Sequence, residues 1–170
     1  PPFSYPVEAY QAGHQGQVLV EVRVLENDTI DTPVIKKSSR SEILDNAAIT
    51  LVQQSKFLHG SDVDGKPADM VVIVPVDFSK DSSANLNAKT CADYVADYQW
   101  FTQTFPESKL SEMRLYKLTL GLFTMRMSNV DDILRLGKSY TRIYQKTYGD
   151  CFDNRDHMFM NTLKDNMKWQ

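Results

Sequence analysis

The sequence predicts an α+β protein: a small antiparallel sheet packed with helices, followed by an all-α bundle of about four helices. Two different rhythms of apolar residues predict it. Up to about Lys80 they alternate with period two in several places, as in half-buried strands. From about Ala88 they recur at helical spacing instead. The polar link DSSANLN separates the two patterns, so we expect two domains, at residues 1–80 and 88–170.

Two strands are expected near the start of the chain. The segment QVLVEVRVLE places four β-branched residues on one face, namely Val18, Val20, Val22 and Val24. The turn residues END follow, and TIDTPVIKKSS then predicts a second strand. The two strands should form a hairpin.

A helix and a further strand complete the first domain. SSRSEILDNAAITLVQQSKF has helical spacing, and Ser39 followed three residues later by Glu42 fits a capping box. MVVIVPVDF, residues 70–78, predicts a strand although it contains Pro75, which cannot donate to a sheet ladder and is tolerated at an edge. Its second face, with Val71 and Ile73, is apolar enough that we expect it to be partly covered.

The second part of the chain should contain four helices, near residues 88–105, 108–127, 129–148 and 156–169. The third has the clearest apolar seam, formed by Val130, Ile133, Leu134, Gly137, Tyr140, Thr141, Tyr144 and Tyr148. The connections are short, which favours antiparallel packing of the helices.

The composition of the chain argues against some classes of function. The net charge of −3 argues against a nucleic-acid-binding protein. No run of about 18 apolar residues is present, so we expect no direct membrane insertion by this segment.

Two interpretations of Cys91 and Cys151 stay open: buried free thiols, or a disulfide, which we favour and which implies an oxidising compartment. The bridge would stabilise the fold by roughly 4 kcal/mol through its loop of about 60 residues.

The sequence offers little chemistry. His14, His59 and His157 lack metal-ligand spacing, and DVDGKPAD predicts a turn and not a calcium loop. Glycine-rich phosphate-binding motifs and a nucleophile elbow are not found in the sequence. We therefore expect no catalytic residues, no metal, no cofactor and no enzymatic activity.

Several short segments in order resemble the C-terminal domain of the TonB energy-transducer family. They are YPVEA from Tyr5, GQVLVEVRV from Gly16, SSRSEILDNAAI from Ser38, GKP from Gly65 and VPVDF from Val74. Arg40 stands where the family usually has glycine. The resemblance covers residues 3–78 and leaves the helical part unmatched.

The resemblance implies a periplasmic adaptor that binds the TonB-box peptide of an outer-membrane transporter. It would transmit energy for the uptake of substrates such as siderophores from an inner-membrane proton-motor complex. That complex would act through an N-terminal region outside this sequence, with the full-length protein anchored in the inner membrane. We expect the peptide to add as a strand to an edge formed by Val71, Val72, Ile73, Val74, Pro75, Val76 and Asp77.

Two alternatives stay open. The first is an envelope scaffold that reuses the domain without force transduction and binds its partner through the helical part. The second is a small hydrolase within the helical part, which a buried cluster of acid, base and nucleophile would favour.

Overall fold

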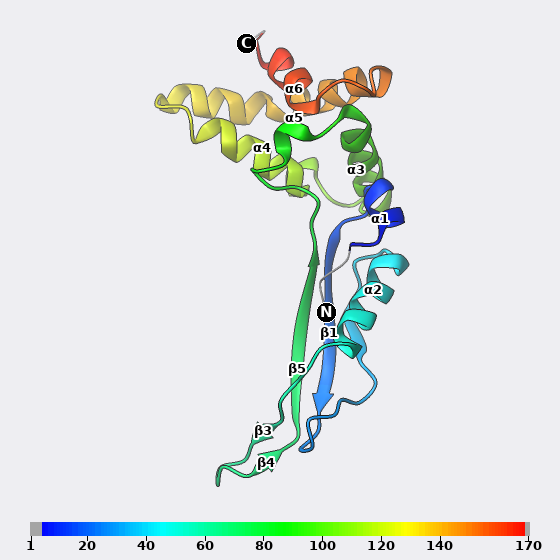
Figure 1. Ribbon diagram of the computed structural model, residues 1–170. Coiled ribbons are helices and arrows are strands. Elements are labelled where there is room, and N and C mark those ends of the chain that lie inside the picture. Colours follow the sequence, from blue (N-terminus) through cyan, green and yellow to red (C-terminus); the bar gives the residue numbers. More distant parts are fainter. Residues whose placement is uncertain (1–4, 169–170) are drawn as a thin grey trace. The chain divides into compact units, whose positions relative to one another are not determined.

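The computed structural model describes residues 5–168, which form two compact units (Figure 1). Residues 5–10 and 14–79 make the first unit, which contains the long strands. Residues 11–13 and 80–168 make the second unit, which is helical. The α+β fold class predicted from the sequence is confirmed.

The first unit contains a three-stranded antiparallel sheet in the order β2-β1-β5. The strands are β1 (Gly16–Val24), β2 (Val34–Lys37) and β5 (Met70–Phe78). β1 and β5 pair one residue to one residue over their whole length, and the two long strands run side by side in Figure 1. β2 pairs with the other edge of β1, with a register irregularity beside Leu19 and Val20. The predicted hairpin is confirmed, and β5 ends the sheet.

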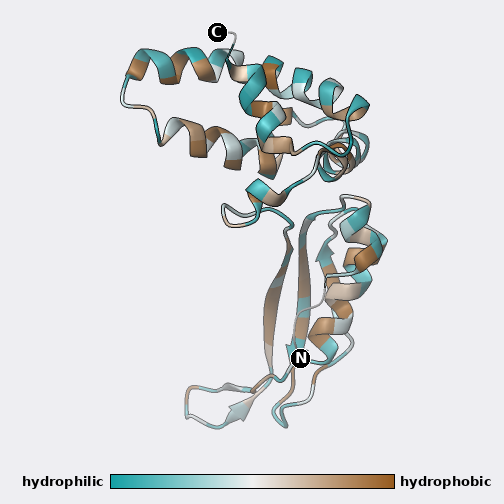
Figure 2. Cartoon of the chain, turned by 45° about the horizontal axis from the view of Figure 1, so that its top comes forward, coloured by the Kyte–Doolittle hydropathy of each residue, from teal (hydrophilic) through white to brown (hydrophobic). Residues whose placement is uncertain are grey.

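The valine face of the sheet packs against helix α2 (Glu42–Gln53). All four predicted valines of β1 are fully buried, together with Leu44, Ala48 and Val52 of the helix. Val76 and Phe78 of β5 join the same core, and Figure 2 shows β5 as hydrophobic along much of its length. The period-two alternation in the sequence therefore identified this core correctly.

The start of α2 differs from the prediction. Ser41, and not Ser39, is the N-cap residue, and its side chain accepts a hydrogen bond from the Leu44 N–H at 3.4 Å. Ser39 instead donates to a carboxylate oxygen of Asp45 at 2.8 Å. Between the two serines, Arg40 has φ +66°, a left-handed conformation in which glycine is favoured. Glycine, which the resemblance leads us to expect at this place, would adopt the same conformation without strain.

Besides two 3₁₀ turns, at Leu86–Ala88 and Leu110–Glu112, three short elements were not predicted. Helix α1 spans Val7–Gln11, and strands β3 (Gly60–Ser61) and β4 (Pro67–Ala68) pair as a small hairpin. The turn of this hairpin is closed by a hydrogen bond from the Asp62 N–H to the Lys66 carbonyl, 2.9 Å. The segment DVDGKPAD is thus a turn, as expected.

The second face of β5 is open. Val71 is 61% exposed and Ile73 is 49% exposed, so the expectation that this face is partly covered was wrong. The reason is that α2 packs on the valine side of the sheet, where the even-numbered side chains of β5 lie.

The second unit contains the four predicted helices, α3 (Cys91–Thr104), α4 (Arg114–Thr124), α5 (Val130–Asp153) and α6 (Phe159–Met167). α4 is shorter than expected, because a 3₁₀ turn at Leu110–Glu112 precedes it. The core of this unit is rich in aromatic residues. Tyr94, Tyr144 and Phe159 are fully buried, and the Tyr94 hydroxyl donates to the backbone carbonyl of Tyr144 at 2.8 Å.

The apolar seam predicted for α5 is only partly right. Tyr140 and Tyr144 are buried, but Val130 is 67% exposed and Leu134 is 57% exposed. The face of α5 that joins the core of the unit includes Leu136, which a helix of 3.6 residues per turn places almost opposite Leu134. The first turns of α5 therefore direct the predicted seam to solvent.

A disulfide links two helices of the helical unit. Cys91 at the start of α3 is bonded to Cys151 in the last turn of α5, with a Cα–Cα distance of 4.8 Å. Both cysteines are fully buried. The structure therefore contains the expected bridge instead of two free thiols.

Candidate partner-binding edge

The hydrogen-bond directions of β1 determine which backbone groups of β5 face outward. In a strand, the backbone N–H and C=O groups of successive residues point to opposite edges. The carbonyl of Arg23 accepts a hydrogen bond from the Asp31 N–H at 3.0 Å, in the connection that leads to β2. Odd-numbered residues of β1 therefore direct their backbone groups toward β2, and even-numbered residues direct theirs toward β5.

The unbroken register carries this alternation onto β5. Val72, Val74 and Val76 lie opposite Val22, Val20 and Val18, so their backbone groups pair with β1. The residues between them lie opposite odd-numbered positions of β1 and direct their backbone groups to the outer edge; these are Val71, Ile73, Pro75 and Asp77. The seven residues predicted as the binding site thus lie in one strand but divide into an inward and an outward set.

This division explains Pro75. It lies opposite Leu19, at a position where the two strands exchange no hydrogen bond. Its nitrogen points to the outer edge, so the missing N–H does not weaken the ladder to β1. The proline removes one donor from the outer edge, which limits pairing with unintended strands.

The outer edge offers both the groups and the surface that an added strand needs. No neighbouring strand among residues 5–168 pairs with this edge, since β5 is the last strand of its sheet. The N–H and C=O groups of Val71 and Ile73 point outward there, and their side chains are exposed on the open face. An extended peptide could pair with this backbone and place alternate side chains beside Val71 and Ile73.

Other polar groups of the described residues offer no metal site. His14 Nδ1 lies 2.8 Å from the Ser41 hydroxyl, and His59 Nδ1 lies 2.7 Å from the Gly60 carbonyl. Within residues 5–168, no three His, Cys, Asp or Glu residues are placed to hold a metal ion together. A search of the same residues for a helix that is long and apolar enough to cross a membrane finds none.

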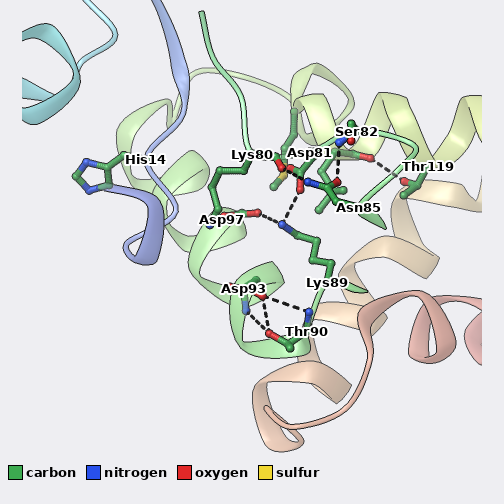
Figure 3. A network of polar contacts seen from close by, with 12 residues as sticks. His14, Lys80, Asp81, Ser82, Asn85, Lys89, Thr90, Asp93, Asp97 and Thr119 are labelled. Atoms are coloured by element: carbon green, nitrogen blue, oxygen red, sulfur yellow. Dashed lines mark hydrogen bonds and ion pairs between the residues drawn. The ribbon is translucent and has the colours of Figure 1, made fainter. Parts of the chain in front are cut away.

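Sequence reasoning missed a buried cluster of four charges in the helical unit (Figure 3). Lys80 Nζ lies 2.7 Å from one oxygen of Asp97, and Lys89 Nζ lies 2.5 Å from the other. Lys89 Nζ is also 2.7 Å from a carboxylate oxygen of Asp81. The four side chains are at most 6% exposed. No sequence signal could have identified the cluster, because its members are spread over 18 positions without a motif.

The electrostatics of this cluster indicate a structural role. Burial alone lowers the pKa of Lys89, but Asp97 and Asp81 outweigh it and raise that pKa above its ordinary value. Each carboxylate is bound by a lysine, so the charges balance inside the protein. The cluster contains no hydroxyl or thiol nucleophile, and burial keeps substrates away. It therefore gives no support to the hydrolase alternative.

Comparison with known proteins finds a match for the first unit. Residues 1–79 match the family model described as Gram-negative bacterial TonB protein C-terminal. The chain is 40% identical over 78 residues to "Protein TonB" from Xanthomonas campestris pv. campestris, strains B100 and ATCC 33913, covering 46% of this chain and 34% of theirs. It is 38% identical over 74 residues to "Protein tonB2" from Pseudomonas aeruginosa, covering 44% of this chain and 27% of that protein. The match thus spans between about a quarter and a third of the length of these relatives. No solved structure matches the chain.

Proposed function

Residues 1–79 belong to the TonB C-terminal domain family, and on this premise we propose that the chain acts as a periplasmic adaptor that binds an outer-membrane transporter. The bound element is the TonB-box peptide of the transporter, added as a strand to the outer edge of β5. The observation that carries this proposal is the position of β5 at the end of its sheet as residues 5–168 form it, with the backbone groups of Val71 and Ile73 pointing outward.

Strand addition suits a contact between the peptide and β5 that must bear a pulling force and then dissociate. Each backbone hydrogen bond contributes only about 0.5–1.5 kcal/mol net, but several in a row share a load. The exposed side chains of Val71 and Ile73 provide apolar contacts for alternate residues of the peptide. The contact would hold under tension while the bonds act together and separate when they open one by one.

The energy for transport would come from an inner-membrane proton-motor complex. It would reach this domain through an N-terminal region of the full-length protein, anchored in the inner membrane. The family membership of residues 1–79 supports this assignment. The transported cargo would be a substrate such as a siderophore.

The direct test is a titration of the isotope-labelled chain with TonB-box peptides, followed by NMR. We expect the largest amide shift changes between Val72 and Asp77, with the clearest effect at Ile73, because its N–H faces outward. A scrambled peptide is the control. If the amides of this stretch do not respond to any of the peptides, the strand-addition site is wrong.

A second function is favoured by the helical unit. Residues 80–168 lie outside the family match and have their own aromatic core and a disulfide. In this alternative the protein is an envelope scaffold, and its helical unit binds the partner without transmitting force. Transporter-dependent growth separates the two functions: it requires the β5 edge in an energy transducer and is indifferent to that edge in a scaffold.

A further inference from the structure

The side of β5 that faces α2 is only partly covered along the outer edge of the sheet. The valines of β1 on this side are fully buried, whereas Met70, Val72 and Val74 of β5 are half-buried. Phe78 is 1% exposed, and Tyr5 packs on it with the ring centroids 5.6 Å apart. The partly open stretch therefore lies toward the Met70 end of β5.

The two flanks of α2 face opposite edges of the sheet. Asp45, Ile49 and Gln53 are four positions apart and form one flank. Asp45 accepts a hydrogen bond from the Ser39 hydroxyl at 2.8 Å, just beyond the end of β2. Gln53 lines a hollow together with Ile30, which belongs to the connection from β1 to β2. This flank is therefore directed toward β2.

The opposite flank of α2 is apolar and is directed toward β5. Ile43, Ala47 and Leu51 are also four positions apart, and a helix of 3.6 residues per turn places them about 160° around the axis from the first flank. Ala47 and Leu51 are half-buried against the core, and Ile43 is 36% exposed. α2 packs on β1 and also contacts β5. An apolar helix flank and an apolar strand face therefore form an angle that is partly open along the outer edge of β5.

A strand added to β5 would extend into this angle. Neighbouring strands lie about 4.8 Å apart, and a helix with its side chains is about 10–12 Å across, so the flank of α2 reaches about as far sideways as β5. Successive side chains of the added strand point to opposite faces of the sheet. Those opposite Val72 and Val74 would contact these valines and, from the side, Leu51. Those opposite Val71 and Ile73 would lie on the open face and contact the sheet alone.

We propose that the partner peptide is selected by its two side chains that face α2, opposite Val72 and Val74, and that these side chains are aliphatic. This selectivity rests on the strand addition proposed above and specifies the chemistry of the added strand. Hydrophobic stabilisation is roughly proportional to the apolar area removed from water, so side chains enclosed by both β5 and α2 contribute more than those on the open face. Polar residues are therefore tolerated at the open-face positions and not at the positions that face α2.

A short peptide of alternating valine and threonine tests which face prefers the aliphatic side chain. Both residues are β-branched, and a slip of one residue exchanges the two faces, so the peptide can choose its own register. With ¹³C-labelled valine methyl groups, isotope-filtered NMR on the full chain should show contacts from valine to Leu51 and Ala47. Contacts from valine to Val71 and Ile73, or equal contacts on the two faces, would overturn the inference.

Two matched variants separate the flanks of α2. Leu51→Ala should raise the dissociation constant of the alternating peptide by about 4- to 15-fold, the effect of one or two methylene groups losing apolar contact. Ile49→Ala shortens a half-buried aliphatic side chain on the flank directed toward β2 and should leave the affinity unchanged. Circular dichroism checks that both variants are folded. Equal effects of the two substitutions on affinity would contradict the assignment of the flanks.

The response of β5 itself distinguishes this inference from the proposed function. If neither TonB-box peptides nor the alternating peptide change the amide shifts of β5, the strand-addition site is wrong and the selectivity is wrong with it. If TonB-box peptides bind at β5 but the alternating peptide does not, the proposed function stands and the role of the α2-facing side chains is refuted.

Discussion

Replacing Ile73 by proline tests the hydrogen-bond directions of β5. The substitution removes one N–H that faces the outer edge and leaves the ladder to β1 intact, because Ile73 lies opposite the odd-numbered Glu21. Loss of one backbone hydrogen bond costs about 0.5–1.5 kcal/mol, so the dissociation constant of a TonB-box peptide should rise by about 2- to 13-fold. The free energy of unfolding should change much less than in the following variant.

Val74→Pro is the matched comparison. Val74 lies opposite Val20, which is fully buried, so this proline leaves an inward carbonyl of β1 without its donor. An unsatisfied buried group costs about 1–3 kcal/mol, which should appear as a loss of stability in urea denaturation. Conversely, Pro75→Val adds an outward donor and should tighten peptide binding by about 2- to 13-fold.

Isothermal titration calorimetry with one transporter peptide measures all three variants, and Ile73→Ala controls for the lost side chain while keeping the N–H. If Ile73→Pro binds like Ile73→Ala, and Val74→Pro alone weakens the peptide, then the even-numbered residues face outward. That result would refute the assignment of the two edges of β5.

Three further predictions concern stability, and urea denaturation measures each. Arg40→Gly should stabilise the first unit by about 1 kcal/mol, since glycine relieves the left-handed strain, whereas Arg40→Ala retains the strain and should give no such gain. Asp97→Asn should destabilise the helical unit by about 3–5 kcal/mol, because two buried lysines lose a charged partner; the exposed Asp165→Asn should change it by less than about 1 kcal/mol. The helical unit should lose stability as the pH rises above 10. Burial raises the pKa of Tyr144, and the neighbouring carboxylates raise that of Lys89 despite burial, so the folded state holds protons that the unfolded state releases. Unfolding that is independent of pH between 9 and 12 would contradict this last expectation.

The parts of the fold predicted from sequence are those with a local signal. Alternating valines identified β1 and its buried face, and helical spacing identified α2. The cap of α2 was placed at Ser39 because a serine three residues before a glutamate is a common motif. The structure uses Ser41 instead, since the left-handed turn at Arg40 delays the start of the helix by two residues.

Features that depend on distant contacts were not predictable. Whether Val130 and Leu134 are buried depends on which face of α5 meets α3 and α6, and that choice is made by tertiary packing. The charge cluster around Asp97 likewise forms only when the segment after β5 folds onto α3. The edge position of β5 was predictable because Pro75 marks it locally.

The disulfide has a mechanical consequence. Tension applied between the first unit and a point beyond residue 151 would travel through the sulfur atoms, because Cys91 and Cys151 are covalently linked across 60 positions of sequence. The backbone of residues 92–150 would then bear no tension. Reduction of the bond would let this loop unravel and add roughly 200 Å of extension, at about 3.3–3.6 Å per residue. The bond would thus keep the loop between Cys91 and Cys151 from extending under such a load.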